Sequence, residues 1–275
     1  MYGAILGDIV GEPYEFRKAP WWKNFELFTA NPTFTDDSVM TVAIAEALTK
    51  TYKKSDDKIR KAVIKSMHKW GAKYPDAGYG GGFWYWLNSS KDKPYNSFGN
   101  GSAMRASAAG WFAKDLEDAE RLGMLTADVT HNHPEGIKGA QAVAAIIYLA
   151  RTEKVKAGAT PESVKAVIKD YIESRYEDYN VSRTCNEIRL TYHFNETCQG
   201  TVPEAICAFL EGKDYEDVIR TAVTLGGDCD TLTCIAGGMA EALYGMPDEF
   251  MLKVREIIDD EMVAVVDNAY KHALS

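Results

Sequence analysis

The sequence predicts an all-α fold, and three observations lead to that prediction. Strand signals are nearly absent, because the chain has no sustained period-two alternation and no Asn-Gly hairpin between β-branched runs. Several segments instead carry apolar residues at helical spacing. Helix-start signals precede some of them, as in Thr160-Pro161-Glu162-Ser163, where proline takes the first helical position. No change in composition marks a linker, so we expect residues 1–275 to form a single compact domain.

The predicted helices follow one another along most of the chain. A short glycine-bearing helix covers residues 3–12 and is stopped by Pro13. Further helices are predicted for residues 39–48, 57–70, 117–125, 135–150, 161–175, 201–210, 218–225 and 232–243. The helix over 135–150 is apolar around most of its circumference, so we place it centrally. Pro247 starts the last helix, residues 77–84 are predicted to be a flexible glycine loop, and residues 176–199 are polar and irregular.

Composition and charge limit the classes of function. The net charge of −9 argues against non-specific binding to nucleic acid and against attraction to anionic membranes. No apolar run approaches the length of a membrane span, and no signal peptide opens the chain. Five cysteines without a C-x-x-C pair indicate reduced thiols, so we expect a cytoplasmic protein. Four tryptophans are more typical of core than of base-stacking platforms: Trp21, Trp22, Trp84 and Trp86.

Two glycines and two aspartates lie where one apolar helix gives way to another, in Gly226-Gly227-Asp228-Cys229-Asp230-Thr231. The glycines allow a positive-φ turn, and the carboxylates then fall at a helix start, where free N–H groups favour negative charge. A helix cap needs only one Asp or Thr, so three oxygen-bearing side chains in four residues favour a site for a hard cation. The thiol of Cys229 has no histidine in the surrounding stretch, which is typical of a core cysteine rather than a nucleophile.

A second helix start is built in the same way. Phe34-Thr35-Asp36-Asp37-Ser38 precedes a helix that is apolar nearly all round. Either acidic cluster alone could be a capping arrangement. Together they would supply enough oxygen atoms for two Mg²⁺ or Mn²⁺ ions. We therefore predict that the two helix starts meet in the folded protein.

Two loops are candidates for contacts with a substrate. Ser97-Phe98-Gly99-Asn100-Gly101-Ser102 leads into a helix, and such a loop can hold phosphates through backbone N–H groups, although most glycine loops are only turns. His131 and His133 flank Asn132 just before another helix, where a capping loop is the simpler interpretation. Zinc is disfavoured, because no third His or Cys lies at a ligand spacing.

Five blocks of the sequence together resemble the ADP-ribosylglycohydrolase family, which includes the dinitrogenase-reductase-activating glycohydrolase and the eukaryotic ADP-ribosyl-acceptor hydrolases. The blocks run in the family's order, which makes chance similarity implausible. They cover residues 7–15, 34–38, 99–105, 130–134 and 225–231. The resemblance implies a compact single-domain orthogonal helical bundle with two Mg²⁺ (or Mn²⁺) ions at the base of a cleft.

The resemblance also implies roles for individual residues. The metal ligands would be Thr35, Asp36, Asp37, Asp228, Asp230 and Thr231. Glu15 would act in catalysis beside the metals, together with Asp36. The residues that would bind the substrate are Gly81, Ser97, Phe98, Gly99, Asn100, Gly101, Ser102 and His131. Among them the loop from Ser97 to Ser102 would hold the diphosphate, His131 would face the adenosine or phosphate side, and Gly81 would lie near the distal ribose.

The activity implied by the resemblance is hydrolysis of the bond from ribose C1″ to a leaving group, which releases ADP-ribose from an ADP-ribosylated protein or a small conjugate. The metals would hold the 2″- and 3″-hydroxyls, and Glu15 would act as general base or general acid. The alternatives are a metal-dependent nucleotide phosphohydrolase and a non-enzymatic ADP-ribose-binding member of the fold. Residues 176–199 match no family block, so the acceptor linkage is left open among arginine, serine, O-acetyl, poly-ADP-ribose and a nucleic-acid end. The choice of Mg²⁺ or Mn²⁺ and the oligomeric state are open as well.

Overall fold

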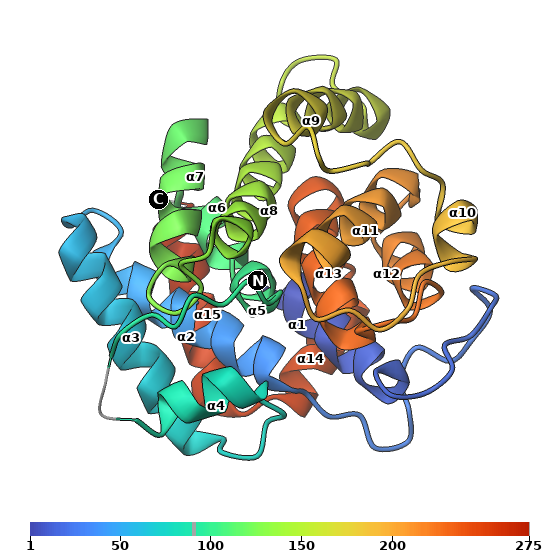
Figure 1. Cartoon of the computed structure of the whole chain (residues 1–275). Coiled ribbons are helices and arrows are strands. Elements are labelled where there is room, and N and C mark those ends of the chain that lie inside the picture. Colours follow the sequence, from blue (N-terminus) through green and yellow to red (C-terminus); the bar gives the residue numbers. More distant parts are fainter. Residues whose placement is uncertain (90–91, 275) are drawn as a thin grey trace.

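Helices make up nearly all the regular structure of the computed structural model, which describes residues 1–89 and 92–274 (Figure 1). Within these residues the β pairing is limited to an isolated antiparallel bridge between Gly99 and Thr197. The predicted all-α class is therefore confirmed. The extent of the domain over 1–275 stays a prediction, and its residues 90, 91 and 275 lie outside the described part. No helix among the described residues is long and apolar enough to cross a membrane.

Fifteen α-helices and one short 3₁₀ helix are formed by the described residues. They are α1 (Tyr2–Gly11), η1 (Glu12–Tyr14), α2 (Asp36–Thr51), α3 (Asp56–Lys73), α4 (Gly81–Leu87), α5 (Gly101–Met104), α6 (Ser107–Phe112), α7 (Leu116–Ala127), α8 (Pro134–Glu153), α9 (Pro161–Arg175), α10 (Cys185–Arg189), α11 (Cys198–Glu211), α12 (Tyr215–Val223), α13 (Cys229–Tyr244), α14 (Asp248–Ile257) and α15 (Asp260–Ala273). Each predicted helix has a counterpart among them.

Helix α13 lies at the centre of the fold, surrounded by α1, α8, α11 and α12 (Figure 1). All of its residues from Cys229 to Leu243 are buried, and so is every residue of α1. Helix α8, which the sequence places centrally, packs on α6, α7 and α13 and buries one long side. The apolar character that identified these helices in the sequence therefore corresponds to burial against several neighbours.

Glycines set the distance between α1 and α13. A Cβ atom on Gly7 of α1 would lie 2.1 Å from the carbonyl oxygen of Thr233, and a Cβ on Gly237 of α13 would lie 2.3 Å from the carbonyl oxygen of Gly3. No side chain fits into these gaps, so the two backbones pack directly against each other. As a result, the second half of α1 lies beside the first two turns of α13.

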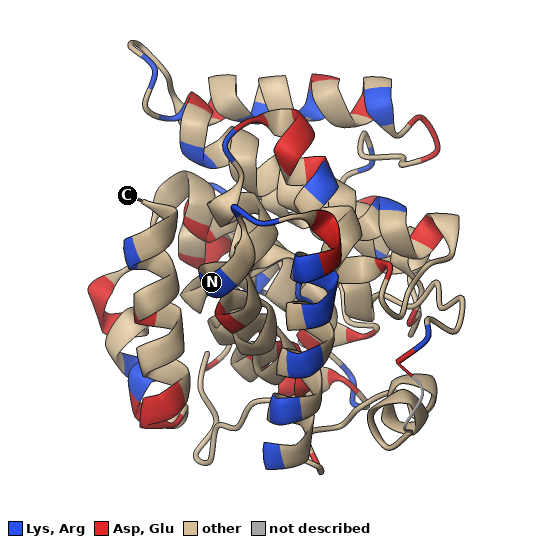
Figure 2. Ribbon diagram, turned by 90° about the vertical axis from the view of Figure 1, so that its left-hand side faces the viewer, with Lys and Arg blue, Asp and Glu red and all other residues tan. Residues whose placement is uncertain are grey.

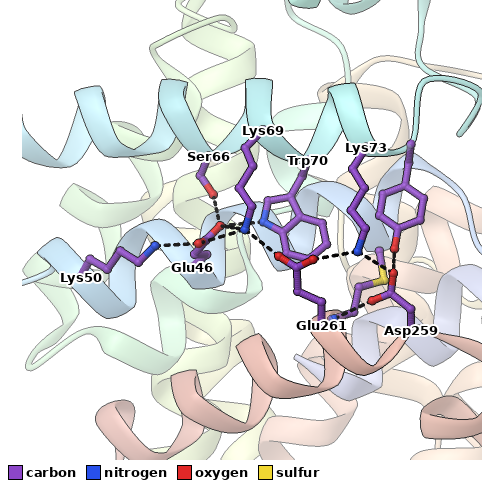
Figure 3. Close-up of polar contacts among 10 residues, drawn as sticks. Glu46, Lys50, Ser66, Lys69, Trp70, Lys73, Asp259 and Glu261 are labelled. Carbon is purple, nitrogen blue, oxygen red and sulfur yellow. Dashed lines mark hydrogen bonds and ion pairs between the residues drawn. The ribbon is translucent and has the colours of Figure 1, made fainter.

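A network of charged side chains covers the contact of α15 with α2 and α3 (Figure 3). Glu46 of α2 accepts hydrogen bonds from Lys69 at 3.3 Å and from the indole of Trp70 at 2.7 Å, and both donors belong to α3. Lys69 and Lys73 also reach Glu261 of α15, at 2.8 and 2.9 Å. Exposed ion pairs contribute little to stability individually. Helix α15 is therefore held mainly by burial of its apolar face, which consists of Met262, Val266 and Ala269. Figure 2 shows charges of both signs interspersed along the outer helices.

The last helix predicted from Pro247 is wrong in one respect, because the structure has two helices there. Ile258 is extended, with ψ 158°, and ends α14. The side chain of Asp259 then accepts a hydrogen bond from the backbone N–H of Met262 at 2.9 Å and caps the start of α15. A cap of this kind inside an amphipathic stretch divides one predicted helix into two.

Two further predictions about local structure are corrected. Residues 77–84 are not all loop, because α4 begins at Gly81 and buries Phe83 and Trp86 at three-residue spacing. Helix α11 begins at Cys198 rather than Thr201, because the Thr197 hydroxyl accepts a hydrogen bond from the N–H of Gly200 at 3.2 Å. Pro203 consequently lies inside the helix instead of at its start.

The expectation that four tryptophans belong to the core holds for one of them. Trp86 is 4% exposed, whereas Trp21, Trp22 and Trp84 are 49, 75 and 46% exposed. The first two lie in the loop between η1 and α2, and Trp84 lies on the solvent side of α4. Exposed aromatic side chains of this size call for a physical explanation.

Two adjacent glycines of α13 provide a test of the α1–α13 contact. Gly237→Ala would place a methyl group 2.3 Å from the backbone of α1, so we expect it to lower the free energy of unfolding by about 1–3 kcal/mol through overpacking. Gly238→Ala is the matched control, because its Cβ would have no neighbour closer than 3.5 Å. We expect this control to be neutral or to stabilise by up to about 1 kcal/mol. Urea unfolding measures both, and equal effects would contradict the close approach.

Candidate metal centre

Three helices bring their carboxylates together at one point. Asp8 comes from the middle of α1, Asp37 from the first turn of α2 and Asp230 from the first turn of α13. One oxygen atom of each lies within 4.8 Å of the others, and all three residues are buried. Glu15 and Asp228 form a second group of this kind with the same Asp230. The two acidic helix starts of the sequence therefore meet, and Asp230 is common to both groups.

The turn before α13 has the conformation that its glycines predict. Gly226 and Gly227 have φ angles of 70° and 75°, in the left-handed region that favours glycine. A Cβ on Gly227 would also lie 2.4 Å from the ring of Tyr192. The turn ends at Asp228, the N-cap of α13, and places Asp230 in the first turn of the helix. The carboxylates thus sit at the positive end of a central helix.

Asp8 belongs to the group of buried carboxylates, although the sequence analysis assigned it no role. Its carboxylate is fully buried and accepts hydrogen bonds from the backbone N–H groups of Thr35 at 2.9 Å and Ser38 at 3.1 Å. It also accepts from the hydroxyls of Thr35, at 2.8 Å, and Ser38. These contacts fix the turn that starts α2, so that Asp37 points toward Asp230. The available signal was an ionisable residue within an otherwise apolar helix.

The carboxylate of Asp37 is only half satisfied by hydrogen bonds. Its Oδ2 atom accepts from the hydroxyls of Thr231 at 3.1 Å and Thr35 at 3.3 Å. Its Oδ1 atom is buried and has no hydrogen-bond partner among the described residues. A buried charged oxygen without a partner is costly, and one oxygen of this carboxylate lies within 4.8 Å of an oxygen of Asp230. The unsatisfied oxygen indicates a place for a cation.

Burial raises the pKa of every carboxyl group in the centre, and repulsion between carboxylates adds to this effect for all of them except Asp8. Burial raises the pKa of Asp8 and of Asp228 to about 6 each. Burial, with the negative charges of Asp230 and Asp8, raises the pKa of Glu15 to about 8. The same two causes raise the pKa well above its usual value for Asp36, Asp37 and Asp230. Among the described residues, no Lys or Arg forms an ion pair with any of these groups.

This donor set fits hard divalent cations. It consists only of oxygen atoms from carboxylates and threonine hydroxyls, which suit Mg²⁺ and Mn²⁺ better than softer metals. The concentration of negative charge without a basic partner calls for positive charge from outside the chain. The residues present therefore fit the two ions that the sequence predicts, although the identity of the metal stays a prediction.

The carboxylates lie at one end of a cleft with a volume of about 220 Å³. Most of the residues predicted for the site line it: Glu15, Asp36, Asp37, Gly81, Ser97, Gly99, Asn100, Gly101, His131, Asp228, Asp230 and Thr231. Three predicted residues do not line it, namely Thr35, Phe98 and Ser102. The lining also includes residues without a predicted role: Tyr95, Met104, Arg105 and Glu196.

The side chains of Phe98 and Ser102 are directed away from the cleft. Phe98 is 45% exposed, and its ring lies 5.3 Å from that of His133. The hydroxyl of Ser102 donates to the carbonyl of Gly136 at 2.7 Å. Any contact of these two residues with a substrate stays a prediction. Thr35 lies beneath the cleft, where its hydroxyl bonds to Asp8 and approaches Asp230 at 3.4 Å.

Asn100 supports the metal centre from the glycine loop. Its amide nitrogen donates to the carboxylate of Asp228 at 2.7 Å and lies 3.0 Å from the hydroxyl of Thr201. Its backbone N–H donates to the carbonyl of Glu196 at 2.8 Å. The loop predicted to contact the diphosphate is therefore also attached to a carboxylate of the centre.

Arg105 and His131 fix the glycine loop from the other side. Arg105 is buried and donates to the carbonyl of Gly101 at 2.9 Å and to the hydroxyl of Thr130 at 2.8 Å. The same hydroxyl lies 2.8 Å from Nδ1 of His131. Burial and the charge of Arg105 lower the pKa of His131, so its imidazole is neutral. Its Nε2 atom lies against Gly101, where an added Cβ would be 3.3 Å away.

The fold and the cleft define the class of protein as an all-α protein with a cluster of buried carboxylates at one end of a cleft. The model of the ADP-ribosylglycohydrolase family matches residues 1–274. The chain belongs to the ADP-ribosylglycohydrolase family, and by that membership it is a hydrolase. The resemblance found in the five sequence blocks is thereby confirmed.

Individual relatives agree with this assignment. The ADP-ribosylhydrolase ARH3 of Mus musculus is 25% identical, over 89% of this chain and 82% of the relative. The ADP-ribosylarginine hydrolase Tri1 of Pseudomonas putida (strain GB-1) is 29% identical, over 57% of this chain and 42% of the relative. A solved structure described as an ADP-ribosylglycohydrolase-related protein complex is 21% identical, with a TM-score of 0.73 over 98% of this chain and 95% of that one. At this identity the solved structure shows a shared fold.

Addition of metal tests the centre directly. We expect Mg²⁺ or Mn²⁺ to raise the thermal unfolding temperature, with stabilisation of about 2.7 kcal/mol when the ion is at 100 times its dissociation constant. EDTA should reverse the shift. Asp230→Asn should abolish it, and this variant without metal should be more stable than the metal-free wild type, because a buried repulsion is relieved.

The matched control is Asp248→Asn, which changes an exposed aspartate in the first turn of α14. This variant should keep the full response to metal. A wild-type protein whose unfolding temperature responds to neither Mg²⁺ nor Mn²⁺ would contradict the assignment of a metal centre.

Proposed function

We propose that this chain hydrolyses the C1″ glycosidic bond of ADP-ribosylated protein side chains or related ADP-ribose conjugates and releases ADP-ribose, and that it depends on two Mg²⁺ (or Mn²⁺) ions. The observation that carries the proposal is the meeting of two groups of carboxylates on Asp230 at one end of the cleft. Membership of the ADP-ribosylglycohydrolase family supports it. So do the names of two relatives, an ADP-ribosylhydrolase and an ADP-ribosylarginine hydrolase.

The predicted ligands of the two ions are Thr35, Asp36, Asp37, Asp228, Asp230 and Thr231. Asp8 is better suited to a positioning role, because all its hydrogen bonds go to the turn at the start of α2. When bound, the two ions would offset the carboxylate charges and polarise oxygen atoms of the substrate next to them.

Glu15 is the proposed acid–base catalyst. It lines the cleft beside Asp228 and Asp230, and a pKa of about 8 lets it hold a proton near neutral pH. In the proposed step the bond from C1″ to the leaving atom breaks, the electron pair goes to the leaving atom, and Glu15 protonates that atom. A water molecule then forms the new bond to C1″, and its proton returns to Glu15.

Asp36 and the glycine loop would bind or stabilise the substrate and would take no part in proton transfer. Asp36 lines the cleft at the start of α2, where its negative charge can stabilise positive charge that develops at C1″. The loop from Ser97 to Gly101 lines the cleft on the side of His131, as expected of a diphosphate-binding segment. The neutral imidazole of His131 can donate or accept a hydrogen bond there without adding charge.

The predicted cytoplasmic location is part of the proposal. All five cysteines are buried and without disulfide bonds, which is typical of proteins in reducing compartments. Cys229 is among them, and its buried thiol lies 3.8 Å from the carbonyl oxygen of Val223, as expected of a core cysteine.

The proposed function is tested by product analysis with a panel of ADP-ribosylated substrates of defined linkage, each with Mg²⁺ and after EDTA. We expect free ADP-ribose from at least one linkage, and only in the presence of metal. AMP or inorganic phosphate as the product would show nucleotide phosphohydrolase chemistry instead. Binding of ADP-ribose without turnover of any conjugate would show a non-enzymatic member of the fold.

Glu15→Gln tests the acid–base role. We expect the rate of ADP-ribose release to fall by about 10²–10⁴-fold, because the amide cannot transfer the proton. The thermal shift produced by Mg²⁺ should be reduced less than in Asp230→Asn, since Glu15 belongs to only one of the two carboxylate groups. Glu12→Gln, three residues earlier in η1, is the matched control and should keep the wild-type rate. A Glu15→Gln variant with the wild-type rate would contradict the role.

A further inference from the structure

Five large apolar side chains are exposed on two neighbouring segments beside the cleft. Phe16, Trp21 and Trp22 lie in the loop after η1 and are 79, 49 and 75% exposed. Leu190 and Phe194 lie between α10 and α11 and are 72 and 44% exposed. We call these five residues the aromatic shelf. Monomeric proteins rarely expose contiguous apolar surface on this scale, and aromatic side chains are enriched where proteins bind other proteins.

Contacts between the two segments make the shelf continuous. The rings of Phe16 and Phe194 lie 5.5 Å apart. The guanidinium of Arg189, at the end of α10, lies 5.5 Å from the ring of Trp21. Figure 1 shows the loop after α1, drawn in blue at the right, beside α10 and α12. Trp22 and Leu190 directly follow Trp21 and Arg189 in the sequence, so the five side chains gather along the contact between the two segments.

The shelf is attached firmly to the helices beneath it. Lys23, next to Trp22, pairs with Asp217 of α12 at 2.7 Å. Arg220 of α12 donates to the carbonyl of Lys23 at 2.8 Å, and Arg189 donates to the carbonyl of Thr224 at 3.0 Å. The backbone on both sides of the shelf is thus held in place while the large side chains face solvent. Their exposure is a feature of the folded surface rather than of a loose loop.

One end of the aromatic shelf lies next to Glu15, at the side of the cleft where the proposed leaving group would be protonated. Glu15, the proposed acid–base catalyst, lines the cleft and directly precedes Phe16. On the other segment Glu196 lines the cleft two residues after Phe194. In the proposed reaction the group protonated by Glu15 is the acceptor, so the molecule that carries the acceptor would lie next to Phe16 and Phe194. The cleft, at about 220 Å³, is too small to enclose a protein, so a polypeptide that carries the acceptor would stay outside it.

We propose that the aromatic shelf binds the polypeptide that carries the ADP-ribosylated side chain, so that the preferred substrate is a modified protein rather than a small ADP-ribose conjugate. This inference rests on the proposed function. The partner is a polypeptide segment with apolar side chains next to the modified residue. Charges of both signs surround the shelf, with Arg17 and Lys18 on one segment and Glu196 on the other, and an apolar centre with a mixed charged rim is the usual composition of a protein–protein interface. The carboxylate of Glu196 at the cleft would repel the phosphates of a nucleic acid.

The test compares one ADP-ribosylated protein with the single ADP-ribosylated amino acid of the same linkage, as substrates for the full chain with Mg²⁺. The double variant Trp22→Ser/Leu190→Ser removes two exposed side chains that do not line the cleft. We expect kcat/KM for the protein to fall by about tenfold or more and kcat/KM for the amino acid to stay unchanged. Activity on the amino acid also shows that the variant is folded. The matched control is Leu252→Ser on α14, which is 62% exposed and should change neither value.

The remaining outcomes would contradict the inference for different reasons. Equal losses for both substrates, or no loss for either, would show that the shelf does not contact the polypeptide. A wild-type dimer that the double variant converts to a monomer, with both kcat/KM values unchanged, would show that a second copy of the chain covers the shelf. A wild-type protein that releases ADP-ribose from neither substrate would overturn the proposed function, and the inference with it.

Discussion

The direct packing of α1 on α13 is the constraint on which the metal centre depends. Only glycine at positions such as Gly7 and Gly237 lets the two backbones approach closely enough to place Asp8 near the first turn of α13. Asp8 in turn orients the first turn of α2 through Thr35 and Ser38. A wider separation of these helices would leave the carboxylates too far apart to share a cation. The core of the fold therefore sets the geometry of the site.

The centre also explains why the fold tolerates an unfavourable arrangement of charge. Carboxylates are buried together without a basic partner among the described residues. Burial raises the pKa of each, and repulsion raises it further for Asp37, Asp228 and Asp230. Such an arrangement destabilises the protein in the absence of cations and is compensated by the apolar packing of α1, α8 and α13. The negative charge gathered in this way is what the two proposed ions would offset.

The two sides of the cleft are built differently, which would separate the proposed chemistry from recognition of the acceptor. The carboxylates lie at helix ends that are fixed by the core. The rim beside Glu15 consists of the loop after η1 and the segment between α10 and α11, where large side chains remain exposed. The second of these segments lies within the part of the sequence, residues 176–199, that matches no block of the family. A rim built from loops, on a floor fixed by the core, would allow the proposed reaction to serve different acceptors.

The sequence by itself determined the helical class, most of the helices and the two acidic helix starts, because periodicity, capping residues and the turn at Gly226 act over a few neighbouring residues. It did not determine the role of Asp8 or the bond from Asn100 to Asp228, since each depends on a partner far along the chain. It also placed Trp21 and Trp22 in the core, whereas the tertiary structure left them exposed. Local patterns identify which residues can form a helix or bind a cation. Only packing between distant segments decides which side chains meet and which face solvent.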